Sequence, residues 1–411
     1  MVALDFPPCQ SAGVQRTLKF AEYLVELGWQ PIVLTVNESV YTATDRNIKI
    51  PESIKVYRCK SLDSARDFSV KGKYFAWSKI PDRWWSWTIS AVPMGKKLID
   101  KYLPDIIWST YPVSTAHYIA YKLHKYGQIN WVADYRDPLQ CRYDKNALQY
   151  SFVAKWIEKK TIQHCIKAVF STDRAAQLYS RLYPNEKLTK FHIIENGFDE
   201  ANFNDLPILP EIGHMRFTLL HSGAIYPQGR DPIALFEGIH ALKKEGVVDS
   251  SNFSLIFRGA VSTPVIKSQI IQLEIEDLIE FKPNIPYKES LAEMMSANVL
   301  VLIQGKLFNN QIPGKGYEYI RANRPILALT PTTSATGELY RDYALSRAVD
   351  TADLIKQAIH SFIKNQDISI DNPLVSIYSR QHKTLELANL LNDLCLNSSK
   401  NYELKRDDCD N

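Results

Sequence analysis

Short apolar runs alternate with amphipathic segments along the first half of the chain. Residues 31–36 and 106–109 are mostly apolar, as in strands of a sheet that is covered on both faces. Residues 14–27 carry apolar side chains at helical spacing, and Gly28 ends that pattern. Further short strands are expected at residues 2–6, 130–133, 168–171 and 191–194. This rhythm of strand and helix predicts a parallel, doubly wound sheet.

The same rhythm restarts after a break that contains prolines and glycine. Strands are expected at residues 217–221, 253–257, 279–281, 299–303 and 326–329, and helices at 231–245 and 289–297. The fold class is therefore α/β, with two Rossmann-like domains over 1–200 and 201–375, a last helix over 376–396 and a polar tail over 397–411. A ligand is expected in the cleft between the domains, at the carboxyl ends of the strands.

Composition narrows the class of protein. The chain has 411 residues, enough for two or three domains, and 45% of them are apolar. Its apolar runs are shorter than the roughly 18 residues that span a bilayer, and no signal peptide is visible at the N-terminus. The six cysteines are scattered, which predicts a reducing, cytoplasmic setting. The first strand begins almost at Met1, so we expect a few residues to precede it.

Positive charge is concentrated in one region. Residues 55–101 contain 11 Lys/Arg and 4 Asp/Glu, a net of +7 in a chain of net charge +4. Aromatic and basic side chains interleave there, including Trp77, Trp84, Trp85, Lys96 and Lys97. This composition predicts an anionic membrane surface as partner and makes nucleic acid a poor candidate. Buried tryptophans with a solvated basic rim are the alternative. Pro93 is expected to interrupt any helix in this region.

The segment 312–329 holds a candidate ligand site. Pro313-Gly314 leads into a short helix on which Lys315 and Glu318 share a face near the N-terminus, before the strand at 326–329. A cation and a carboxylate at that position suit a ligand with a phosphate and a sugar diol. A surface salt bridge between the two residues is the simpler alternative.

Four further turns carry chemistry at predicted strand ends. The turn Asp134-Tyr135-Arg136-Asp137-Pro138 places an arginine between carboxylates, and we favour Asp137 and Arg136 over Asp134 for catalysis. Ser11 and Gly13 lie in the loop before the first helix, while Ser222, Gly223 and Arg230 follow the first strand of the second domain. Gly259 belongs to a second, weaker glycine loop. Thr110, Ser114 and His117 are further candidates to face the cleft.

These motifs, in this order, resemble retaining glycosyltransferases of the GT-B fold, most closely glycosyltransferase family 4. The resemblance rests on the Phe6-Pro7-Pro8 loop, the Arg136-Asp137-Pro138 turn, Ser222-Gly223 and the helix with Lys315 and Glu318. Many bacterial polysaccharide-assembly members share the P-G-K-x-x-E-Y form. Asn310 departs from the family, because it stands where the first glutamate of an E-x7-E pattern is usual.

The resemblance implies an activity and a set of partners. Glu318 would bind the ribose of a UDP- or GDP-sugar, Lys315 and Arg230 would stabilise the leaving diphosphate, and no metal or cofactor would be needed. The first domain would receive a lipid-linked glycan during synthesis of lipopolysaccharide, capsule or exopolysaccharide. The last helix would cross back to that domain. Localisation would be cytoplasmic, with peripheral attachment to the inner face of the plasma membrane.

Three alternatives remain open at this point. A nucleotide-sugar epimerase on the same fold would need neither membrane nor acceptor. A non-catalytic homologue would bind the nucleotide-sugar without turnover, and Asn310 keeps that alternative open. A membrane scaffold without a nucleotide site is the third.

Overall fold

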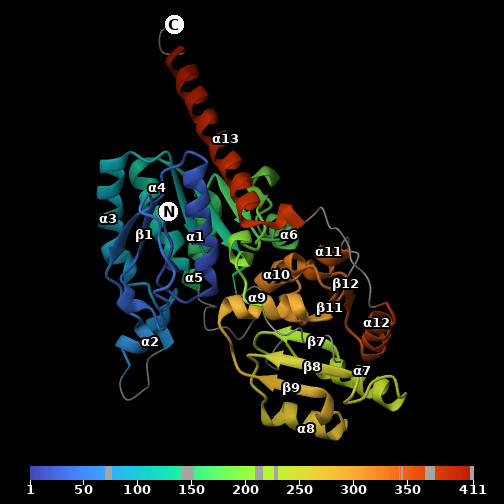
Figure 1. Cartoon of the computed structure of the whole chain (residues 1–411). Coiled ribbons are helices and arrows are strands. Elements are labelled where there is room, and N and C mark those ends of the chain that lie inside the picture. The colour runs from blue at the N-terminus through green and yellow to red at the C-terminus, as the bar shows by residue number, and fades with distance from the viewer. Residues whose placement is uncertain are drawn as a thin grey trace. The chain divides into compact units, whose positions relative to one another are not determined.

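The structure, a computed structural model, describes residues 1–69, 76–139, 152–208, 216–225, 230–341, 343, 346–365 and 375–407. The side chains of Ala12, Ala76, Trp77 and residues 397–407 lie outside this description. The chain divides into two compact units, Met1–Asn196 with Arg380–Asn411, and Gly197–Ser379 (Figure 1).

The first unit is built on parallel strands. β1 (Ile32–Val36) pairs with β2 (Lys55–Cys59), and β3 (Ile106–Thr110), β4 (Asn130–Arg136), β5 (Lys167–Phe170) and β6 (Phe191–Ile193) form a four-stranded group. Val2 joins the two groups, because it bridges Leu34 of β1 and Ser109 of β3 in parallel. The strand expected at 2–6 is thus a single bridge. Asp5 turns out of the sheet toward the next loop, where its carboxylate accepts a hydrogen bond from Ser11.

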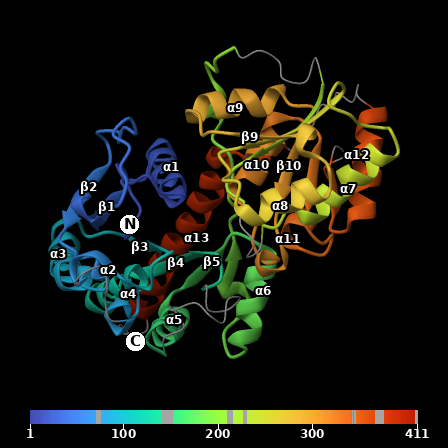
Figure 2. The ribbon, with the colours of Figure 1, turned by 90° about the horizontal axis from the view of Figure 1, so that it is seen from below.

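Helices cover both faces of this sheet (Figure 2). Buried residues of α3 (Trp87–Tyr102), α4 (Ser114–Gly127), α5 (Phe152–His164) and α6 (Asp173–Leu182) share one core cluster with the strands. Residues of α1 (Ala12–Glu26) and α13 (Arg380–Asp407) share a second cluster. The Ser11 hydroxyl caps α1 by accepting from the Gly13 N–H. The last helix does pack on the first unit, as the family resemblance implies.

Two helix boundaries that were expected from the sequence are wrong. α3 continues through Pro93, because its buried face, with Ala91, Gly95 and Leu98, packs on the core while the proline ring faces solvent. α13 begins at Arg380 and continues to Asp407 through the segment expected to be a polar tail. That segment contains neither glycine nor proline, so nothing in it stops a helix. A short helix, α2 (Ser64–Asp67), was not expected.

The second unit is a six-stranded parallel sheet in the order β12-β11-β10-β7-β8-β9. Its strands are β7 (Phe217–Ser222), β8 (Phe253–Arg258), β9 (Ile279–Lys282), β10 (Val299–Ile303), β11 (Ile326–Leu329) and β12 (Ser346–Val349). Only β12 was not expected from the sequence. The strand order reverses between β7 and β10, and such a switch point is where doubly wound sheets bind ligands.

Helices cover both faces of this sheet too (Figure 1). α7 (Ile233–Lys244), α8 (Pro264–Gln272) and α12 (Ala352–Lys364) contribute buried residues to one core cluster. α9 (Tyr287–Ser296), α10 (Gly314–Ala322) and α11 (Ala335–Arg341) contribute to the other. The predicted fold class is confirmed, with two doubly wound α/β units in one chain.

Candidate functional site

Lys315 lies at the switch point of the second sheet. It follows Pro313-Gly314 in the first turn of α10, and its Nζ donates a hydrogen bond to Ser222 Oγ, 3.4 Å away at the end of β7. Burial lowers the pKa of the Lys315 ammonium; Glu318 opposes that shift and Arg230 adds to it. Arg230 therefore lies close enough for its charge to act on Lys315. The structure brings together a cation, a hydroxyl and a helix N-terminus, which suits an anion.

Gly223 makes room for that lysine. Its φ is +143°, and a Cβ at this position would lie 3.2 Å from Lys315 Cε. The backbone at Gly223 can therefore pass directly beneath the lysine side chain.

We expect Gly223→Ala to lower the free energy of unfolding by about 1–3 kcal/mol, because alanine rarely adopts this backbone conformation. Chemical denaturation checks this. Gly314→Ala is the matched control: a Cβ there meets nothing within 4 Å, and its φ is ordinary. Equal losses in both variants would show that Gly223 has no special role.

Buried side chains hold the end of β7 in place. The Ser222 N–H donates to Tyr319 Oη at 3.1 Å, and Tyr319 Oη lies 3.4 Å from the Val301 carbonyl oxygen of β10. The His221 Nδ1–H donates to the same carbonyl at 2.9 Å. Burial lowers the pKa of His221 to about 4, so this imidazole is neutral at pH 7. Sequence reasoning gave no role to Tyr319 and His221, because their contacts join segments that are far apart in the sequence.

Glu318 hydrogen-bonds Tyr287, whereas the simpler alternative from the sequence was a salt bridge with Lys315. Its Oε1 accepts a hydrogen bond from Tyr287 Oη at 2.7 Å, and among the described residues no ion pair joins it to Lys315. The carboxylate is half-buried and keeps one oxygen with no hydrogen bond from a described residue. It can therefore accept a further hydrogen bond, such as one from a ligand hydroxyl.

Two more loops complete this edge of the sheet. Gly259 follows β8 with φ +77°, and a Cβ there would lie 2.0 Å from Asn284 Oδ1. After β10, the buried Gln304 amide donates to the Gln311 carbonyl at 2.6 Å and so closes the loop that carries Asn310. Residues 226–229, which precede Arg230, lie outside the described part of the chain.

In the first unit, the predicted catalytic turn is a network of buried charges. Arg136 has φ +58°, which is unusual for a residue with a side chain, and a register shift separates it from Asp134 in the pairing of β4 with β5. Its guanidinium donates to Thr110 Oγ1 at 2.9 Å and to the Gly13 carbonyl at 3.1 Å. Thr110 Oγ1 in turn donates to Asp134 Oδ2 at 2.9 Å. These contacts tie three separate turns together.

Asp134 is fully engaged by Arg16, which sequence reasoning missed. Arg16 Nη2 donates to Asp134 Oδ1 at 2.9 Å and Arg16 Nε to Asp134 Oδ2 at 3.1 Å. The side chains of both residues are almost completely buried, with exposed fractions of 2% and 0%. Both oxygens of Asp134 thus accept from a buried guanidinium, and this pair holds the turn in place.

Asp137 keeps more freedom. It is half-buried, and its Oδ1 accepts from Ser171 Oγ at 3.2 Å. Burial raises the pKa of this carboxyl, opposed by the Ser171 hydrogen bond and by the Arg136 charge. Of the two carboxylates in the turn, Asp137 is thus the better candidate for contact with a substrate.

Gly13 lies against the same network. A Cβ on Gly13 would lie 2.2 Å from Asp5 Oδ2 and 2.9 Å from Arg136 Nη1, so both charged groups lie directly above this glycine. Asp5 is buried and also accepts from Ser11 Oγ at 2.9 Å. The structure thus adds Asp5 to the predicted Ser11 and Gly13. His117, by contrast, hydrogen-bonds Ser109 inside the core, and burial lowers its pKa to about 3.

The described tryptophans of the basic region are half-buried or, at Trp87, fully buried. Trp84 packs against the core, and the Trp85 indole N–H donates to the Ser78 carbonyl at 2.9 Å. The ammonium of Lys96 lies over the Tyr126 ring at 4.7 Å, while Lys97 is exposed. The side chain of Trp77 is outside the described residues. Trp84 and Trp85 therefore contribute to packing in the first unit, and a role for them at a membrane stays a prediction.

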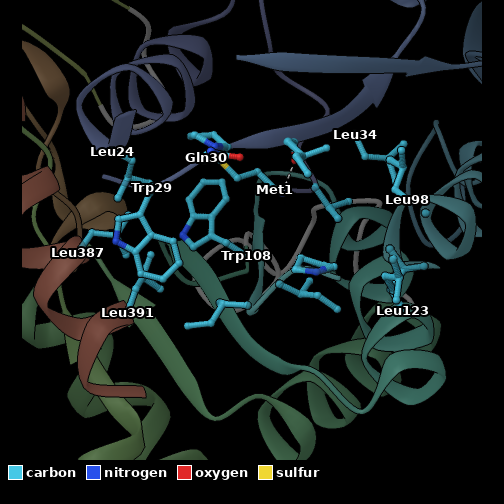
Figure 3. A pocket seen from close by; sticks show the side chains of 18 residues that line it. Met1, Leu24, Trp29, Gln30, Leu34, Leu98, Trp108, Leu123, Leu387 and Leu391 are labelled. Carbon is cyan, nitrogen blue, oxygen red and sulfur yellow. Dashed lines mark hydrogen bonds between the residues drawn. The ribbon is translucent and has the colours of Figure 1, made fainter. Parts of the chain in front are cut away.

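An apolar cavity of about 120 Å³ lies elsewhere in the first unit (Figure 3). Trp29, Trp108, Leu98, Leu123 and Leu391 are among the side chains around it. Met1, Ile32 and Ile106 also line it, so it lies where β1 and β3 begin, at the opposite edge from the charged turns. Its lining has no place for a diphosphate.

Two absences hold for the described ranges only. Within them, no three side chains of His, Cys, Asp or Glu are grouped as metal ligands, and no helix is both long and apolar enough to cross a bilayer.

Comparisons with known proteins show the fold. No family model and no curated protein matches the chain. Among solved structures it is similar to HepE from Anabaena in complex with UDP, with TM-score 0.57, 10% identity and 98% of each chain covered. It is also similar to the lipopolysaccharide outer core galactosyltransferase WaaB, with TM-score 0.59, 10% identity and 94% of this chain and 98% of that chain covered. A UDP-N-acetylglucosamine 2-epimerase, described as putative, from Listeria monocytogenes has TM-score 0.56 and 13% identity over 94% of each chain. At these identities the likeness establishes the GT-B fold alone.

Proposed function

We propose that this protein is a glycosyltransferase that takes a sugar from a UDP- or GDP-sugar. The observation that carries the proposal is the arrangement of Lys315, Ser222 and Glu318 at the switch point of the second unit. Lys315 and the N-terminus of α10 would meet the diphosphate, and the unused oxygen of Glu318 would accept from the ribose hydroxyls. HepE, which has the same fold, was solved with UDP.

The reaction needs charge stabilisation at the leaving group. The bond between the anomeric carbon and the diphosphate oxygen breaks, a bond to an acceptor hydroxyl oxygen forms, and the hydroxyl proton passes to the departing diphosphate. Negative charge develops on the diphosphate, where Lys315 and Arg230 would stabilise it without a metal. We propose transfer with retention, as in the family that the sequence resembles. Asp137 and Arg136 would act on the acceptor side, in the first unit.

The acceptor in this proposal is a lipid-linked glycan in the assembly of a bacterial surface polysaccharide. WaaB, one of the proteins with this fold, acts on the lipopolysaccharide outer core. Epimerisation of the nucleotide-sugar is the second candidate, because the Listeria protein described as a putative epimerase has the same fold at a similar TM-score. An epimer formed without any acceptor would identify that activity.

Thermal unfolding with a panel of UDP- and GDP-sugars tests the donor site. A ligand at 100 times its dissociation constant should stabilise the wild type by about 2.7 kcal/mol. We expect one nucleotide class to raise the melting temperature, and Glu318→Ala to remove that shift. Glu237→Ala, an exposed glutamate of α7, is the matched control and should keep it. A shift that persists in Glu318→Ala would place the nucleotide elsewhere.

A further inference from the structure

Three neighbouring helices of the first unit carry mostly positive charge. α3, α4 and α5 lie on the same face of the sheet, with α4 between the other two (Figure 2). Their eight lysines are Lys96, Lys97, Lys101, Lys122, Lys125, Lys155, Lys159 and Lys160. Their two acidic residues are Asp100, which is exposed, and Glu158, which is buried. The outer surface of these helices is therefore strongly basic.

Aromatic side chains connect the lysines across the three helices. Lys96 of α3 lies over the Tyr126 ring of α4 at 4.7 Å, and Lys122 of α4 lies over Tyr118 at 5.3 Å. Tyr118 contacts Trp156 of α5, with ring centroids 6.0 Å apart. Trp156 is 45% exposed and Phe152, at the start of α5, is 81% exposed. We call this surface, formed by the eight lysines with Tyr118, Tyr126, Phe152 and Trp156, the lysine–aromatic belt.

We propose that the lysine–aromatic belt docks the protein on an anionic phospholipid surface. Lysines attract the phosphates of lipid headgroups, and exposed Trp and Phe rings favour the boundary between headgroups and acyl chains. All eight basic residues of the three helices are lysines. Bidentate recognition of one defined phosphate favours arginine, so a belt of lysines fits a fluid array of phosphates better than a nucleic acid.

This surface differs from the one expected from the sequence. It shares Lys96 and Lys97 with that expectation, but α4 and α5 supply most of its charge and its exposed aromatic rings. The inference deepens the proposed use of a lipid-linked acceptor, since docking would bring the first unit to the membrane. It concerns one face of the first unit only and does not involve the donor site.

Flotation of the full chain with lipid vesicles tests the proposal. We expect the protein to float with vesicles of phosphatidylcholine and phosphatidylglycerol, to stay behind with phosphatidylcholine alone, and to detach at high salt. The triple variant Lys122→Glu, Lys125→Glu, Lys159→Glu should lose at least tenfold in membrane partitioning. Lys244→Glu, Lys267→Glu, Lys364→Glu changes three exposed lysines of the second unit by the same charge and should keep it. Trp156→Ala should weaken the binding that remains at intermediate salt.

Several outcomes would overturn the proposal. If both triple variants lose membrane partitioning equally, binding responds to the net charge of the protein and not to the lysine–aromatic belt. Binding to an RNA oligomer without flotation would make the belt a nucleic-acid surface. Melting temperatures and donor-induced shifts of both triple variants, measured beside flotation, separate docking from unfolding and from the donor site. Glu318→Ala should float like the wild type, so failure of the donor proposal would leave this result unchanged.

Discussion

Arg16→Ala is expected to lower the free energy of unfolding by about 3–5 kcal/mol, because it leaves a buried carboxylate without its partner. Arg16 forms a two-pronged pair with Asp134 and also donates to the carbonyl oxygens of Ile194 and Glu195, each at 2.9 Å. One side chain thus ties α1, the end of β4 and the segment after β6 together. Without Arg16, the Asp134 carboxylate and the carbonyl oxygens of Ile194 and Glu195 lose this hydrogen-bond donor in the core of the first unit.

Denaturant unfolding of the two units measures this effect. Arg16→Lys should recover little stability, since a lysine cannot reproduce the paired N–H donors. Lys356→Ala removes an exposed pair with Glu245 and should leave stability close to that of the wild type. If Arg16→Ala unfolds at the same denaturant concentration as Lys356→Ala, the buried pair contributes nothing net, and Asp134 is free for another role.

Lys315→Ala is expected to weaken binding of a nucleoside diphosphate by about 10- to 100-fold, the effect of one charge-assisted hydrogen bond. The ammonium is half-buried beside Ser222 and Gly223, so water replaces it poorly when it is removed. Titration calorimetry with UDP and GDP measures the change. Lys267→Ala, an exposed lysine of α8, should bind like the wild type.

The lowered pKa of Lys315 predicts that the free energy of unfolding and the affinity for the diphosphate change in opposite directions with pH. Burial holds the pKa of Lys315 below its ordinary value, so between the two values the unfolded state binds the extra proton. The free energy of unfolding of the ligand-free protein should therefore rise with pH in that interval. Affinity for the diphosphate should fall there, because the neutral amine attracts it less. An affinity that stays constant up to the ordinary lysine pKa would contradict the lowered value.

Local patterns in the sequence determine most of the fold. The apolar runs at β7, β8, β10 and β11 each match an observed strand, because a strand buried on both faces must be apolar throughout. β12 is buried on only part of its length, so its sequence lacks the continuous apolar run that marks the other strands. Helix spacing also places Lys315 and Glu318 on one face of α10, since residues three apart lie together on any helix.

Contacts between distant segments are decided only in the tertiary structure. Arg16 and Asp134 are 118 residues apart, and nothing in either local pattern shows that α1 and the end of β4 meet. Tyr287 becomes the partner of Glu318 because α9 and α10 pack side by side on one face of the sheet. The orientation of Trp84 and Trp85 likewise depends on what lies beneath them.

The sequence by itself therefore determined most of the strands, apart from β2 and β12, and the residue types at the switch point, because these follow from interactions within a few residues. Only the tertiary structure decided which charges are satisfied and which remain available. It pairs Asp134 with Arg16, leaves one oxygen of Glu318 without a hydrogen bond from any described residue, and turns the outer faces of α4 and α5 to solvent. Burial and pairing depend on how the sheet order brings chain segments together, and composition alone does not contain that order.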